Sequence, residues 1–162
     1  MVHGTMRERS GLFRPSRFSF VCISSGKGVQ VIEGSCLCGG IRYEYDGAIE
    51  EISICHCSQC RKAQGSAFAA VGPIDSARFR LLSGSELLKE YRATPGKARV
   101  FCGNCGSPIY SARDDLPEKK RLRLGTVDTP FVCGNIFHIH VDSKASWMEI
   151  GDTYPRFPGP KR

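Results

Sequence analysis

Short segments in which hydrophobic and polar residues alternate run along most of the chain. Ile41, Tyr43 and Tyr45 alternate with charged residues, which is the period-two pattern of a strand with one buried face. Short apolar segments bounded by turn residues predict further strands near residues 52–55, 67–71, 79–82, 100–101, 109–110, 122–127 and 136–141. Residues 85–90 fit either a strand or one helical turn, and no segment has the period of a long amphipathic helix. We therefore predict a mainly β fold of antiparallel strands with little helix.

Seven of the nine cysteines fall into three tight clusters: Cys36 and Cys38; Cys55, Cys57 and Cys60; Cys102 and Cys105. Thiolates two or three positions apart can converge on one ion, and alternate residues of a strand point to the same side. A structural zinc takes four protein ligands, whereas a catalytic zinc keeps three and leaves one position open. We therefore assign the two pairs to one closed site and the triplet to one open site.

Other arrangements of these ligands are open at this point. Cys133, His56, His138 or His140 could supply a fourth ligand to the triplet. A disulfide framework is disfavoured, because C-x-x-C pairs in a chain without a clear secretion signal are typical of metal or redox sites. A thioredoxin-like redox role for the C-x-x-C pair at 102–105 would need a βαβ context, and the flanking sequence predicts strands.

Composition and charge narrow the classes of partner. A chain of 162 residues suits a single domain with a real core, and no apolar run approaches the ~20 residues that span a bilayer. The net charge is +7, but the densest basic run, residues 119–123, closely follows acidic residues. We predict a solvated hairpin there rather than a phosphate-binding stripe. We expect a cytoplasmic protein with neither a membrane nor a nucleic-acid partner.

Residues 1–28 differ from the rest, since they are rich in arginine and serine and lack a periodic apolar face. They fit a disordered tail, an organellar transit peptide, or a start codon assigned too far upstream, with translation beginning near Val29 or Val31. A secretory signal is disfavoured because the apolar stretch at 18–23 is short and interrupted. We favour the third interpretation, assign the domain to residues 29–162 and place Cys22 outside it.

Three longer motifs are similar to those of a known family. They are G-S-C-L-C-G-G-I-R-Y at 34–43, I-C-H-C-S-Q-C-R-K at 54–62 and F-C-G-N-C-G-S-P-I-Y at 101–110. They resemble the glutathione-dependent formaldehyde-activating enzyme domain, over about residues 30–158. The resemblance implies a β-tent of antiparallel sheets with two zinc ions per chain. At the matching positions, the structural zinc is held by Cys36, Cys38, Cys102 and Cys105, and the active-site zinc by Cys55, Cys57 and Cys60.

The resemblance also implies a reaction. The family's best-known members join glutathione and formaldehyde to give S-hydroxymethylglutathione, and they are classed with carbon–sulfur lyases. We therefore expect glutathione or another small thiol, and a small aldehyde, as partners at the triplet. Arg61 and Lys62 follow the triplet and either pair with the glutathione carboxylates or are simply exposed. The alternative is a non-catalytic zinc-binding module, because the family also includes a centromere-associated protein.

The remaining candidates have structural explanations. A strand would point His56 away from its cysteine neighbours, which predicts a packing role or a supporting role behind the ligands. His138 and His140 would share one strand face, as a metal pair or as two structural histidines. We expect Cys133 to behave as a small apolar residue, and Trp147 to fill the core or to line the mouth of a pocket.

Overall fold

The computed structural model describes residues 31–161, and the predictions for residues 1–28 lie outside them. The described part contains ten strands, one α-helix and four short 3₁₀ turns. In chain order these elements are β1 Val31–Ser35, β2 Arg42–Asp46, β3 Ile52–Cys55, α1 Ser58–Gln64, β4 Ala69–Asp75, η1 Ser76–Arg78, β5 Phe79–Ser83, η2 Ser85–Leu87, β6 Leu88–Thr94, β7 Lys97–Cys102, β8 Pro108–Arg113, β9 Leu116–Arg123, η3 Leu124–Thr126, β10 Ile136–Ile139 and η4 Val141–Ser143. The mainly β fold predicted from the sequence is confirmed.

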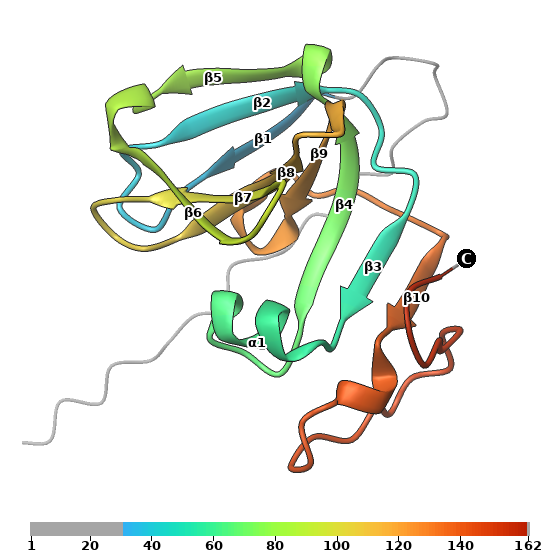
Figure 1. The fold of residues 1–162 in the computed structure, drawn as a ribbon. Helices are drawn as coiled ribbons and strands as arrows, with labels where there is room; N and C mark the ends of the chain where they lie inside the picture. Colours follow the sequence, from blue (N-terminus) through green and yellow to red (C-terminus); the bar gives the residue numbers. More distant parts are fainter. Residues whose placement is uncertain (1–30, 162) are drawn as a thin grey trace, which may run out of the picture.

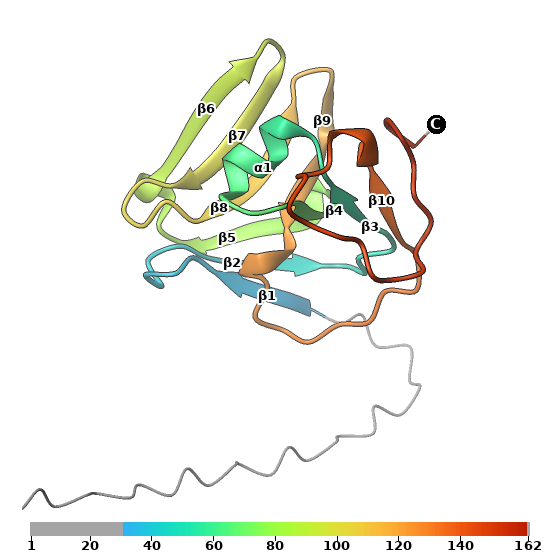
Figure 2. The ribbon, with the colours of Figure 1, turned by 90° about the horizontal axis from the view of Figure 1, so that it is seen from below.

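The strands form two separate sheets. The smaller sheet has the order β1-β2-β5, and the larger has the order β10-β3-β4-β9-β8-β7-β6. Figure 1 shows the small sheet facing the β6–β9 end of the large one, while β4, β3 and β10 extend away from it towards α1. Seen from below, α1 and the C-terminal segment lie on either side of the ends of β3 and β4 (Figure 2). Neither sheet closes into a barrel.

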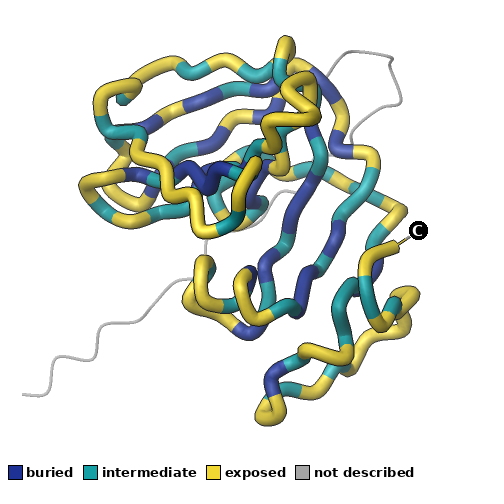
Figure 3. The backbone as a smooth tube through the Cα atoms, in the orientation of Figure 1, coloured by how far each residue is buried: buried dark blue, intermediate teal, exposed yellow. Residues whose placement is uncertain are grey.

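The core fills the space between the two sheets. Ile41 and Tyr43 are fully buried, Tyr45 nearly so, and the alternating charged residues of β2 are exposed or half-buried, as the period-two pattern predicts. Ile109 and Leu122 of the large sheet join the same cluster. Figure 3 shows the buried positions as dark blue segments along the strands of both sheets. The burial of these side chains holds the sheets face to face.

The structure corrects one prediction about strand direction. β10 pairs with β3 in parallel, through Ile136 opposite Ile52 and Ile139 opposite Cys55, whereas all other pairings between strands are antiparallel. The pattern of buried residues is the same for both directions, so it cannot distinguish them. A parallel pair needs a long connection, and here about half of the chain, residues 56–135, separates the two strands.

Residues 85–90 form a 3₁₀ turn followed by the start of β6, so both of the elements predicted as alternatives there are present. Two other local predictions need correction. The basic run of residues 119–123 is only partly solvated, because Arg123 is 4% exposed. Trp147 is 74% exposed and does not fill the core.

Candidate metal centres and the cleft beside them

The first cluster of thiols joins the two sheets. Cys36 and Cys38 lie on the turn that follows β1, Cys102 ends β7, and Cys105 lies on the turn into β8. Their four sulfurs lie within 4.8 Å of one another. The sequence-based grouping of the two pairs is therefore matched by the geometry.

The sulfur spacing of this cluster fits a tetrahedral metal ion. Cys36 Sγ lies 3.4 Å from Cys38 Sγ, which in turn lies 3.9 Å from Cys102 Sγ. Four sulfurs around zinc at ~2.3 Å would be about 3.8 Å apart, whereas a disulfide would bring a pair to ~2.05 Å. The Ile41 amide also donates to Cys36 Sγ over 3.2 Å. The cluster therefore suits a closed four-thiolate site.

The second cluster is held by the end of a strand and the start of a helix. Cys55 ends β3, Cys57 caps the N-terminus of α1, and Cys60 lies in its first turn. The Cys60 amide donates to Cys57 Sγ over 3.4 Å, so the helix start fixes this thiol. The three sulfurs lie within 4.8 Å of one another. Among residues 31–161, these two clusters are the only groups of three or more histidine, cysteine, aspartate or glutamate side chains close enough together to hold a metal ion.

The close contact between Cys55 and Cys60 shifts the pKa values of these two thiols. A hydrogen bond with Cys55 lowers the pKa of Cys60 to about 5, and the same bond together with burial raises the pKa of Cys55. The buried Arg123 guanidinium lies against Cys60 and further lowers its pKa. These opposite shifts of the two pKa values arise because the two thiols share one hydrogen bond, and a bound cation would take the place of the shared proton.

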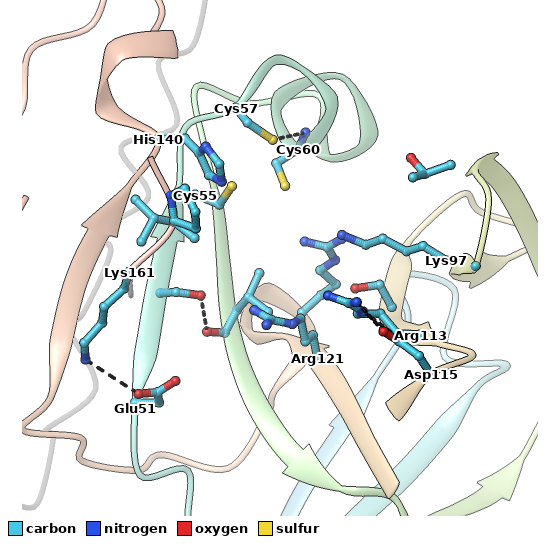
Figure 4. Close-up of a pocket in the computed structure, with 18 of the residues that line it drawn as sticks. Glu51, Cys55, Cys57, Cys60, Lys97, Arg113, Asp115, Arg121, His140 and Lys161 are labelled. Atoms are coloured by element: carbon cyan, nitrogen blue, oxygen red, sulfur yellow. Dashed lines mark hydrogen bonds and ion pairs between the residues drawn. The ribbon is translucent and has the colours of Figure 1, made fainter. Parts of the chain in front are cut away.

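A cleft of about 990 Å³ opens beside the three thiols. All three line it, as do residues of β4 and β7–β10, and none of the other four clustered cysteines does. Figure 4 shows the sulfurs of Cys55, Cys57 and Cys60 at one end of the cleft, with the His140 ring beside them. The three-thiol cluster therefore faces a space large enough for a small molecule.

Charged side chains occupy both walls of the cleft. Lys97, Arg113 and Arg121 extend from β7, β8 and β9, while Glu51 and Lys161 face them from the other side (Figure 4). Burial lowers the pKa of Lys97, and the nearby Cys60 opposes this shift. The sequence did not single these residues out individually, because exposed and cleft-lining cations look alike in a list of residues.

Arg61 and Lys62 lie on the helix, outside the lining of this cleft. The Arg61 guanidinium donates to the backbone oxygen of His56 over 3.2 Å, and Lys62 is exposed. Their pairing with substrate carboxylates stays a prediction. Other cations are closer to the cleft.

Two of the candidate histidines, His56 and His138, belong to one chain of hydrogen bonds. His56 is fully buried, its Nε2 lies 2.8 Å from His138 Nδ1, and His138 Nε2 lies 3.1 Å from both oxygens of Asp152. Since a carboxylate only accepts, a neutral His138 donates through Nε2 and accepts at Nδ1 from His56. Burial, more than any other cause, lowers the pKa of His56. This chain of bonds ties the loop that carries the thiols to the C-terminal segment.

His140 leaves the strand instead of continuing it. Its φ of 56° is left-handed, β10 ends at Ile139, and the His140 side chain lines the cleft. His138 and His140 therefore do not share a strand face, and neither joins a metal cluster. Cys133 is half-buried and also lies outside both clusters.

Replacing His138 with phenylalanine is expected to lower the free energy of unfolding by about 1–3 kcal/mol, because the buried His56 Nε2–H would lose its acceptor. Urea unfolding followed by circular dichroism measures this change. The matched control is His140→Phe, because the His140 imidazole makes no hydrogen bond among the described residues. This variant should change the free energy of unfolding by less than about 1 kcal/mol. Equal losses of unfolding free energy in the two variants would contradict a stabilising role for the hydrogen bonds that link His56, His138 and Asp152.

The comparisons with known proteins agree with this geometry. The family profile described as glutathione-dependent formaldehyde-activating enzyme matches residues 31–143, which include all seven clustered cysteines. The chain belongs to this family. The matched segment contains both thiol clusters and all ten strands of the described fold.

Individual relatives of this family member are more distant. An uncharacterized lyase of Schizosaccharomyces pombe is 35% identical over 82 residues, which cover 49% of this chain and 56% of that protein. The match therefore spans little more than half of the yeast relative. The crystal structure of a Rhodobacter sphaeroides protein, 24% identical, covers 61% of this chain and 90% of its own with a TM-score of 0.53. That likeness concerns the fold alone.

Among the described residues, no helix has the length and apolar character needed to cross a membrane.

Proposed function

We propose that this protein is a zinc-dependent carbon–sulfur lyase that adds glutathione or a related small thiol to formaldehyde or another small aldehyde. The observation that carries the proposal is the contrast between the two clusters. Four thiols meet where the sheets join, whereas three thiols line a cleft of about 990 Å³. Family membership and the lyase name of the yeast relative support the reaction class.

The proposed reaction balances without an external oxidant or reductant. The thiol sulfur attacks the carbonyl carbon of the aldehyde and forms the new C–S bond. The electron pair of the C=O π bond moves to oxygen, which takes up the proton that the thiol lost. Zinc held by Cys55, Cys57 and Cys60 would supply an open position for the substrate sulfur and favour its thiolate form.

The side chains of the cleft supply binding and charge balance. Three thiolates with a divalent cation carry one net negative charge, so a further thiolate would meet repulsion. The Arg123 guanidinium, which is buried against Cys60, offsets part of that charge. The walls of the cleft hold the rest of the thiol molecule and restrict its approach to the aldehyde.

Replacing Cys57 with serine is expected to abolish the acceleration of thiol addition, because the variant loses one of only three ligands at the open site. The zinc content should fall from about two ions per chain to about one. The measurement is the rate of S-hydroxymethyl thiol formation with glutathione and formaldehyde, above a protein-free control, since thiols add to formaldehyde unaided. Metal analysis by mass spectrometry gives the stoichiometry.

Cys133→Ser is the matched control, because this thiol lies outside both clusters and its loss should leave rate and metal content unchanged. A wild-type rate equal to that of a folded Cys57→Ser variant would reject catalysis. If glutathione still bound to the wild type by calorimetry, the protein would be a thiol-binding zinc module instead of an enzyme.

A further inference from the structure

One face of the large sheet carries an unusual group of cations. Lys97 and Arg99 are two residues apart on β7, and Arg121 and Arg123 are two apart on β9, so each pair points to one side of the sheet. Ser111 of β8 lies opposite both Arg99 and Arg121 in the strand register. These four cations, which we call the basic face, therefore lie side by side. Like charges so placed repel one another.

The acidic residues of the cleft do not neutralise the basic face, because they already have partners. Asp115 pairs with Arg113, Asp114 with Arg92 at 2.9 Å, and Glu51 with Lys161 at 3.8 Å. Within residues 31–161, no carboxylate lies within ion-pair distance of Lys97, Arg99, Arg121 or Arg123. The basic face is thus left with uncompensated positive charge.

Two of these cations are also removed from water. Arg99 is 9% exposed and Arg123 is 4% exposed. The Arg99 Nη2 donates to Gln59 Oε1 over 2.7 Å, but its buried Nη1 has no hydrogen-bond partner. A buried charged donor without an acceptor is costly. A bound anion is one group that could satisfy this donor.

We propose that the basic face binds the anionic end of the thiol substrate, and that this end carries two negative charges. This inference rests on the proposed thiol addition at the neighbouring three-thiol cluster. Lys97, Arg121 and Arg123 line the same cleft as the three thiols, so one molecule can reach both. A dicarboxylate or a phosphate monoester has the required charge, and guanidinium groups bind both in a bidentate manner.

Counting charges favours a dianion over a single carboxylate. One of the four cations, Arg123, faces the thiolates and offsets their one net negative charge. The other three, Lys97, Arg99 and Arg121, have no such partner. The bound substrate thiolate adds a second negative charge at the zinc. A monoanionic end would then leave one positive charge uncompensated in a partly desolvated site, whereas a dianionic end would balance the four cations.

The test uses three small thiols that differ mainly in charge, with the zinc-loaded full-length chain and calorimetry at low salt. These are 2-mercaptosuccinate with two carboxylates, 3-mercaptopropionate with one, and the neutral 2-mercaptoethanol. The dicarboxylate is expected to bind about tenfold more tightly than the neutral thiol, with the monocarboxylate between them. The variant Arg121→Gln should reduce this ratio to about threefold or less, without changing the affinity for 2-mercaptoethanol.

The control is Arg80→Gln, which removes a guanidinium that is 71% exposed on the other sheet and should leave the charge ranking intact. Competition by succinate and by inorganic phosphate, neither of which has a sulfur, identifies which kind of dianion the face prefers. Equal affinity for the three thiols, or a ranking that Arg121→Gln leaves unchanged, would overturn the inference. If succinate or phosphate bound in an Arg121-dependent way while no thiol bound, anion binding by the basic face would be supported and the proposed thiol addition would be rejected.

Discussion

Replacing Cys102 with serine is expected to unfold the domain. Cys102 is fully buried and ends β7, where it meets the sulfurs that follow β1. Structural zinc in small sites contributes on the order of 10 kcal/mol, and a whole domain has only about 5–15 kcal/mol of stability. Loss of one of the four thiolates would therefore remove most of the free energy that favours the folded domain over the unfolded chain. Near-ultraviolet circular dichroism and zinc content, measured on the purified variant, follow both changes.

The comparison that makes this result specific is Cys57→Ser. That variant should remain folded with about one zinc ion, because its thiol belongs to the cluster beside the cleft and not to the one that joins the sheets. Chelation should follow the same order, with the metal at the cleft removed first. Reversed behaviour, or intact disulfides between these cysteines by mass spectrometry, would contradict the division into a closed and an open site.

Replacing Gly34 with alanine is expected to lower stability by about 3 kcal/mol or more. A methyl group at this position would lie 2.2 Å from the Tyr43 ring and 2.4 Å from the backbone oxygen of Thr126. Neither neighbour can move cheaply, since the buried Tyr43 hydroxyl bonds both the backbone and the side-chain oxygen of Thr126. Urea unfolding of the metal-loaded protein measures the loss.

Gly125→Ala is the control for this substitution, because a methyl group there meets nothing within 4 Å and the backbone is not left-handed. It should change stability by less than about 1 kcal/mol, in either direction. Similar losses at both positions would mean that the close approach of β1 to Thr126 is more adaptable than the geometry indicates.

The sequence was most informative where a pattern had one physical solution. Tyr43 and Tyr45 could be placed in the core because period-two alternation with charged neighbours fits only a half-buried strand. Likewise, the close spacing of cysteines within each pair indicated that each pair supplies two ligands. Two such pairs had few ways to complete a four-ligand site. Both predictions start from local spacing, which a sequence displays directly.

The sequence was least informative where long-range pairing decides the outcome. The parallel match of β10 with β3 leaves no trace in hydropathy. Nor do the charges on β9 reveal that Arg123 is buried, because its desolvation depends on α1 and on neighbouring strands. The left-handed backbone of His140, just after the end of β10, could not be predicted either, because residues other than glycine only rarely adopt a positive φ. These placements all concern the cleft, where tertiary contacts override local preference.

A metal held by the four thiols that join the sheets would also act as a cross-link between distant parts of the chain. It would close a loop of 64 residues between Cys38 and Cys102, and closing such a loop early costs chain entropy that only later contacts repay. During synthesis the first pair of thiols must wait until β7 has been made. Completion of this site would therefore be a late event in folding, and it would depend on metal supply as well as on the amino-acid sequence.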